Sequence, residues 1–201
     1  MSIHPTIQED RSRATKEALT QSAMRLFTQY GCDRVTVDDI CADCKLTKGA
    51  FYHNFPSKDH IVVLSFNLFL DRYLQERFRY DPGMPVPEQL VELYMVTMDF
   101  CRSIGKPITA SNYEAGIRSR VDVRIQGRTF VQLLEQLVRQ GIKEGDFPPE
   151  LTFLEIYQSL VAMFSGMAVK WATQPDEADQ ELDWKKLLRV QLFRMLRPGR
   201  P

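Results

Sequence analysis

Apolar residues recur at spacings of three and four along most of this chain, which is the period of an α-helix that buries one face. The first such segment predicts a helix over about residues 12–30, and Gly31 follows where a left-handed residue can end it. Its apolar positions are Leu19, Ala23, Leu26, Phe27 and Tyr30. No convincing run of alternating apolar and polar residues is bounded by turn residues, so the pattern predicts an all-α fold.

Two short helices are expected after the first. Thr36 is a candidate N-cap before two acidic residues, which predicts a helix over about residues 37–43. Thr47 can cap the next helix, which must end by Phe55 because a proline follows. Two short helices joined by a tight turn are typical of a helix-turn-helix motif, whose second helix enters the major groove of DNA.

The second short helix has two different faces. Phe51 and Phe55 share one side at 100° per residue and are expected to pack inward. The opposite side has Gly49, which allows a partner to approach closely, together with Tyr52 and His53. Lys48 and Ala50 lie at the flanks of this outward side. The formal net charge is zero, so any anion-binding surface must be local, and this face suits a polyanion. The alternative is a merely solvated face with ordinary capping threonines, and periodicity alone favours neither.

Residues 36–61, "TVDDICADCKLTKGAFYHNFPSKDHI", resemble the DNA-binding segment of TetR-family transcriptional regulators. That segment typically has the pattern T-hydrophobic-x-x-I-A-x-x-A-G-V-S-K-G-T-L-Y-H-Y-F-x-S-K-x-x-L. The match is ungapped, and with the preceding helix it covers roughly residues 10–62. The resemblance implies a double-stranded DNA operator as partner, with contacts at or near Thr36, Lys45, Thr47, Lys48, Gly49, Ala50, Tyr52, His53 and Lys58.

Three departures from the family pattern prevent transfer of the family's operator preferences. Ala50 stands where threonine is common, and Asn54 stands where tyrosine is common. Lys45 replaces the glycine that is usual in the turn. We expect Lys45 to take a backbone conformation that glycine adopts freely, at a modest cost in strain, and to add a positive charge near the DNA.

The resemblance also implies two domains. An N-terminal helix-turn-helix domain is expected at residues 1–56, and a larger helical domain for ligand binding and dimerisation at 57–201, with a connecting helix over about 57–80. Further helices are predicted at about 87–103, 108–118, 123–145, 149–172 and 183–196. A small-molecule effector would be bound among Tyr94, Met98, Tyr113, Phe130 and Phe164, although such sets are more often plain core.

The helix expected after residue 149 is apolar at nearly every angle, so it must be covered on both sides. A family-like homodimer would supply one cover, whereas the alternative is an ordinary monomeric bundle. The expected interface residues are Leu154, Val161, Ala168, Trp184, Leu188, Leu192 and Met195.

Cys41 and Cys44 suggest a rival, a thiol-redox or metal-responsive regulator that could also use Cys32 or His60. Structural zinc needs four ligands and no second cysteine pair follows, so we expect no metal and no cofactor. In the family pattern both cysteines fall on alanine positions, which favours a packing role. The histidines match no catalytic spacing, so no enzyme is expected.

The chain is expected to be cytoplasmic and without a membrane segment. Its first residues, "MSIHPTIQEDRSRATK", lack an apolar run behind a basic flank. Its longest apolar stretches, at 61–70 and 160–169, fall well short of the roughly 20 residues that span a bilayer.

Overall fold

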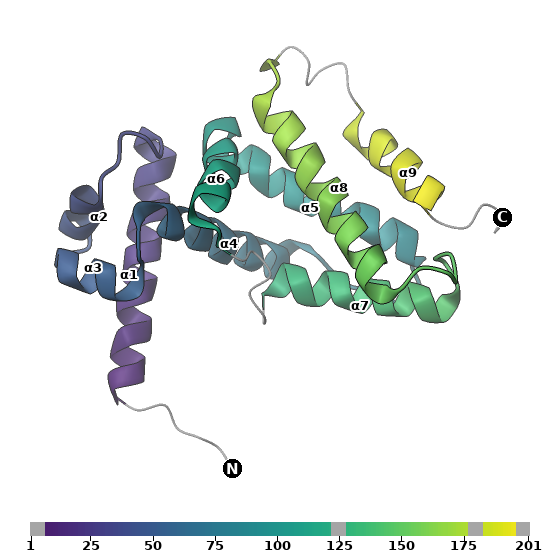
Figure 1. Cartoon of the computed structure of the whole chain (residues 1–201), viewed down its shortest axis with the longest axis horizontal. Coiled ribbons are helices and arrows are strands. Elements are labelled where there is room, and N and C mark those ends of the chain that lie inside the picture. The colour runs from purple at the N-terminus through teal and green to yellow at the C-terminus, as the bar shows by residue number, and fades with distance from the viewer. Residues whose placement is uncertain (1–6, 122–127, 177–182, 196–201) are drawn as a thin grey trace. The chain divides into compact units, whose positions relative to one another are not determined.

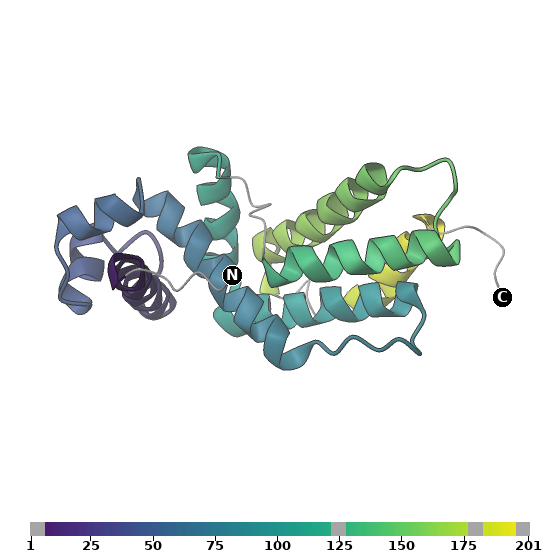
Figure 2. The same ribbon diagram turned by 90° about the horizontal axis from the view of Figure 1, so that it is seen from below.

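Residues 7–121, 128–176 and 183–195 are described by a computed structural model of the chain, without the side chains of 7–10 and 193–195. All regular secondary structure in these ranges is helical (Figures 1 and 2), which confirms the predicted fold class. The helices are α1 (Ile7–Tyr30), α2 (Val37–Asp43), α3 (Lys48–Asn54), α4 (Lys58–Arg77), α5 (Val86–Ile104), α6 (Lys106–Ser119), α7 (Thr129–Glu144), α8 (Phe153–Thr173) and α9 (Trp184–Met195).

The chain folds into two compact units that interleave in sequence. The first contains Met1–Phe69 and Pro107–Val123, and the second contains Leu70–Lys106 and Arg124–Pro201. The first unit therefore includes the beginning of α4 and nearly all of α6, more than the predicted division after residue 56 would give it. The reason is packing, because Ile61 of α4 and Ala115 of α6 are both fully buried in its core.

Helix ends follow local capping chemistry. Thr152 accepts a hydrogen bond from the Glu155 amide at 3.3 Å, so α8 begins at Phe153 and not at the predicted residue 149. The α4 helix stops at Arg77, three residues before its predicted end. The predicted start of the 123–145 helix falls partly outside the described residues.

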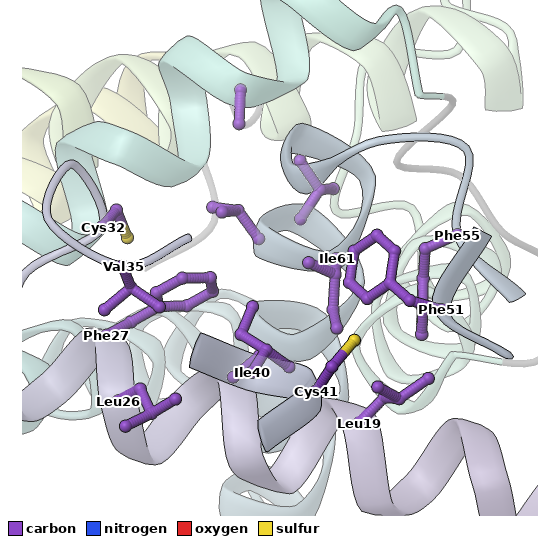
Figure 3. Close-up of a cluster of buried hydrophobic side chains, with 14 residues drawn as sticks. Leu19, Leu26, Phe27, Cys32, Val35, Ile40, Cys41, Phe51, Phe55 and Ile61 are labelled. Carbon is purple, nitrogen blue, oxygen red and sulfur yellow. The ribbon is translucent and has the colours of Figure 1, made fainter. Parts of the chain in front are cut away.

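The core of the first unit fixes α3 against α1 and α2 (Figure 3). Fully buried side chains come from all three helices and from α4: Leu19, Phe27, Ile40, Phe51, Phe55 and Ile61. A polar contact adds to this packing, because Asp43 of α2 accepts hydrogen bonds from Ser22 (2.5 Å) and Arg25 of α1. These two hydrogen bonds hold the pKa of Asp43 below its usual value, and the bond from Ser22 has the larger effect. The α3 helix is therefore presented from a rigid support.

The second unit is a bundle in which α5 packs against α7, α8 and α9, and α7 packs against α8 (Figure 2). Asp71, from the end of α4 that belongs to this unit, accepts a hydrogen bond from the Phe130 amide at 3.2 Å. Asp71 also lies 3.4 Å from the Arg128 guanidinium, and both side chains are largely buried. The same carboxylate thus caps the start of α7 and balances a buried cation.

Among the described residues, no helix combines the length and the apolar character needed to cross a membrane.

Candidate nucleic-acid interface

The α3 helix has the two faces that its sequence predicts. Phe51 and Phe55 are both 0% exposed, whereas the Tyr52 side chain between them is 55% exposed. Around Tyr52, the residues Lys48, Gly49 and His53 are exposed and Ala50 is half-buried. The predicted orientation of the helix is therefore confirmed, and its outer surface is open to a partner.

Threonine caps precede both short helices, as predicted. The Thr47 hydroxyl accepts a hydrogen bond from the Ala50 amide at 3.2 Å and so begins α3. The Thr36 hydroxyl accepts from the Asp39 amide at 3.2 Å and donates to the Asp39 carboxylate at 2.7 Å. The Thr36 hydroxyl, and the Thr36 backbone amide that donates to the same carboxylate at 2.8 Å, lower the pKa of Asp39. A phosphate contact by Thr36 stays a prediction, and it would form beside this carboxylate.

The next helix also begins at a side-chain cap. The Ser57 hydroxyl accepts a hydrogen bond from the His60 amide at 3.3 Å, and Lys58 is the first residue of α4. Lys58 is half-buried, unlike the exposed lysines of the turn and of α3.

The turn between α2 and α3 places Lys45 in the left-handed region, with a φ of 56°. The predicted backbone conformation is therefore confirmed. The turn is closed by hydrogen bonds from the Leu46 amide to the Cys41 carbonyl at 2.9 Å and from the Lys45 amide to the Ala42 carbonyl at 3.3 Å. Because the Lys45 side chain is exposed, the residue combines local backbone strain with an available positive charge.

Lys45→Gly is expected to raise the free energy of unfolding by about 0.5–1 kcal/mol, because it releases left-handed strain that glycine does not have. Urea denaturation of the two proteins measures this difference. Lys45→Ala is the matched control, since it removes the same charge but keeps a Cβ at positive φ, and its stability should not rise. A Lys45→Gly protein less stable than Lys45→Ala would contradict the strain argument.

The cysteines of this segment lie in or beside the core. Cys41 is 5% exposed and its sulfur lies among the apolar side chains (Figure 3), while Cys44 is half-buried and donates to the Ile40 carbonyl at 3.1 Å. Burial raises the pKa of the Cys41 thiol, of Cys44 and of Cys32. A thiolate is the form that binds metals and attacks oxidants, so this environment favours a packing role. No grouping of metal-ligating side chains occurs among the described residues.

The expected effector-binding residues do not all lie in one unit. Tyr94, Met98 and Phe164 are buried and Phe130 is half-buried in the second unit, whereas Tyr113 lies on α6 in the first. The rings of Tyr94 and Phe164 are 4.8 Å apart between centroids, and those of Phe130 and Phe164 are 6.1 Å apart. Three aromatic rings therefore pack on one another, and their role in effector binding stays a prediction.

The expected interface residues divide into exposed and internal ones. Trp184, Leu188 and Leu192 are at most 5% exposed in the single chain, because α9 packs against α5. Ala168 is also buried, and the side chain of Met195 lies outside the described residues. Packing within a single chain, the monomeric alternative, therefore accounts for the burial of Trp184, Leu188, Leu192 and Ala168. Leu154, at 59% exposure, and the half-buried Val161 do reach the surface.

The structure has an exposed apolar face along α8 and α9, and of the expected interface residues only Trp184 lines the groove in it. A shallow, mainly apolar groove between these helices is lined by Ala162, Met163, Gly166, Met167, Lys170, Trp184, Leu187 and Gln191. Val169 and Val190, 38% and 44% exposed, extend the apolar surface. Periodicity did not separate this face from the internal one because α8 is apolar all round.

The described geometry defines a helix-turn-helix protein with a helical second unit. The family model for bacterial regulatory proteins of the tetR family matches residues 19–63, from α1 into the first turns of α4. A TetR-family transcriptional regulator from Pectobacterium atrosepticum has the same fold, with a TM-score of 0.68 at 18% identity over 98% of this chain and 100% of that one. The helix-turn-helix segment of the chain, residues 19–63, therefore belongs to the TetR family.

The curated relatives differ in how much of this chain, and of their own length, the similarity covers. The Tn10 TetC protein of Escherichia coli is 29% identical over 91 residues, 44% of this chain and 46% of TetC. The HTH-type transcriptional repressor KstR2 of Mycolicibacterium smegmatis is 24% identical over 162 residues, 78% of each chain. The chain spans less than half the length of two curated relatives it matches, 46% of TetC and 29% of YuxN from Bacillus subtilis.

Proposed function

We propose that the protein is a transcriptional repressor that binds a palindromic DNA operator as a homodimer. The observation that carries this proposal is the α3 helix, whose buried phenylalanines present Lys48, Gly49, Tyr52 and His53 outward on a rigid support. A helix of this kind fits the major groove, where a glycine allows close approach and polar side chains contact phosphates and base edges. Repression is supported by the resemblance to KstR2, which is described as a repressor.

Binding of DNA by wild-type protein is tested by titrating genomic fragments at several salt concentrations. Phosphate contacts release counterions, so the logarithm of the affinity is expected to fall linearly with the logarithm of the salt concentration. No cofactor or catalytic step is part of this function, and a protein acting on genomic DNA would work in the cytoplasm. Absence of binding to any fragment would contradict the proposal.

The homodimer would form through the exposed apolar face of α8 and α9. This face joins the groove beside Gly166 and Ala162 to Val169 and Val190. Apolar surface of this extent gains free energy when a second copy covers it. Two-fold pairing also places two α3 helices on the two halves of a palindrome.

Gly166→Arg is expected to convert the dimer to a monomer and to leave each chain folded. A Cβ at Gly166 would have no heavy atom within 4 Å, so the larger side chain projects from the surface without disturbing the unit. Analytical ultracentrifugation measures the outcome, and Gly166→Ala is the matched control that should remain dimeric. A wild-type protein that is monomeric at tens of micromolar, or a dimeric Gly166→Arg protein, would contradict this interface.

Release by a small molecule completes the proposal. An effector bound in the second unit, near Tyr94, Phe130 and Phe164, would release the DNA if it favours an arrangement in which the two α3 helices no longer match the half-site spacing. A screen for compounds that release a bound fragment tests this step. Tyr94→Phe should then weaken the response to the compound without changing DNA affinity.

A further inference from the structure

A cavity of about 330 Å³ lies in the second unit, where the ends of α5 and α8 come together (Figure 1). Its volume is at the lower end of the range for small-molecule sites, which is about 300–1,000 Å³. Its residues differ from the aromatic set around Tyr94 that is proposed above for the effector. The cavity is lined by Arg102, Gly105, Lys106, Trp171, Asp176 and Trp184.

Lys106, the first residue of α6, brings a largely buried positive charge to this cavity. Its side chain is only 16% exposed, and its ammonium donates to the Gln174 carbonyl at 3.0 Å. The ammonium also lies 2.7 Å from the carboxylate of Asp176, whose side chain is 90% exposed. It lies 5.8 Å from the ring centroid of Trp171, which adds a cation–π attraction. A largely buried ammonium is therefore balanced by a carboxylate on a well-exposed side chain.

Trp184 supplies a hydrogen-bond donor that lacks an acceptor. The residue is 5% exposed, and its buried indole nitrogen finds no hydrogen-bond partner within the described residues. A buried N–H without a partner is destabilising, and an acceptor on a ligand removes that penalty. The nitrogen is covered in the free chain, so the ring must turn slightly to present it. Together with Trp171, which is also 5% exposed, Trp184 gives the cavity a flat apolar lining.

We propose that this cavity binds a small carboxylic acid with a flat apolar body, namely a single-ring aromatic acid. The ligand carboxylate takes the place of the Asp176 carboxylate at Lys106, where the start of α6 also favours negative charge. Because the Asp176 side chain is exposed, its ion pair with Lys106 is weak and a ligand can displace it. The ligand ring lies against Trp171 and Trp184, and a ligand oxygen accepts from the Trp184 indole.

Benzoate is the probe, and the full-length protein reports its binding without a label. The chain has two tryptophans, Trp171 and Trp184, and both line this cavity. Titration with benzoate should therefore change the intrinsic tryptophan fluorescence to saturation, and calorimetry gives the affinity independently. Benzamide has the same ring without the charge, and it should bind at least about 10-fold more weakly because a charge-assisted hydrogen bond to Lys106 is lost.

Four variants test the residues in turn. Lys106→Met removes the charge but keeps an unbranched side chain, and it should lower benzoate affinity by at least about 10-fold. Lys143→Met, at an exposed position of α7 in the same unit, is the matched control and should bind like the wild type. Asp176→Asn removes the competing carboxylate and should tighten binding about 2- to 5-fold, as a weak ion pair provides. Trp184→Phe keeps an apolar ring without the N–H and should bind more weakly.

A wild-type protein that does not bind millimolar benzoate overturns the inference, and so do equal affinities for benzoate and benzamide. Benzoate binding that is no tighter in folded Asp176→Asn overturns it as well, because the ligand then does not displace that carboxylate. These comparisons decide the question even if Lys106→Met fails to fold. Gly166→Arg should bind benzoate like the wild type, since the site lies within one chain. None of these measurements uses DNA, so their failure is distinct from failure of the proposed function.

Discussion

Tyr52→Ala is expected to lower operator affinity by on the order of 100-fold and to leave the fold intact. Tyr52 stands at the centre of the outward α3 face with its side chain 55% exposed. In the groove it would lose both a flat contact surface and a hydrogen-bonding hydroxyl, and contacts to base edges are worth about 1–3 kcal/mol each. Because the side chain is exposed in the free protein, its truncation should change the free energy of unfolding by about 0.5 kcal/mol or less.

Fluorescence anisotropy with a labelled operator fragment measures this loss. Tyr30→Ala is the matched control, because Tyr30 is 53% exposed and lies at the end of α1 instead of on α3. Lys48→Ala should also abolish tight binding, with a shallower salt dependence that Tyr52→Ala does not show. Wild-type affinity in Tyr52→Ala would refute the proposed DNA face.

Phe51→Ala, one residue away, is expected to destabilise the fold, whereas Tyr52→Ala removes only contacts with DNA. Phe51 is 0% exposed and packs in the core of the first unit, with its ring centroid 5.7 Å from that of Phe55. Removing a buried phenylalanine costs about 3–5 kcal/mol, because transfer free energy is lost and a cavity remains. DNA binding would then fail because the helix-turn-helix unfolds.

Urea denaturation, together with hydrogen exchange of the α1–α3 amides, measures this destabilisation in the unit concerned. Tyr52→Ala is the internal control, since it truncates an aromatic side chain on the other face of the same helix. A decrease of less than about 1 kcal/mol for Phe51→Ala would show that the core does not depend on α3 in the way the structure indicates.

Local features of the motif could be predicted from the sequence because each depends on a few neighbouring residues. Helical periodicity determined which face of α3 contains Phe51 and Phe55. The capping position of Thr47 followed from its hydroxyl and its place before the apolar pattern. The positive φ of Lys45 followed from the resemblance, because the family has glycine at that position.

Contacts between distant segments could not be predicted in the same way. Periodicity indicates that a side chain is buried, but it does not say which element covers it. Ala115 of α6 therefore packs in the first unit, and Leu188 of α9 is buried within its own chain, without a signal in the sequence. An ion pair between Asp38 of α2 and Lys48 of α3 likewise joins two helices across the turn, where no regular spacing relates the partners.

The central claim is that two α3 helices of a homodimer bind a palindromic operator. Its most direct test is selection of genomic fragments by wild-type protein, followed by sequencing and footprinting of those bound. The account predicts an inverted repeat protected over both half-sites, and no enrichment by folded Tyr52→Ala. Equal enrichment by the two proteins, or a wild-type protein that selects no fragment, would contradict it.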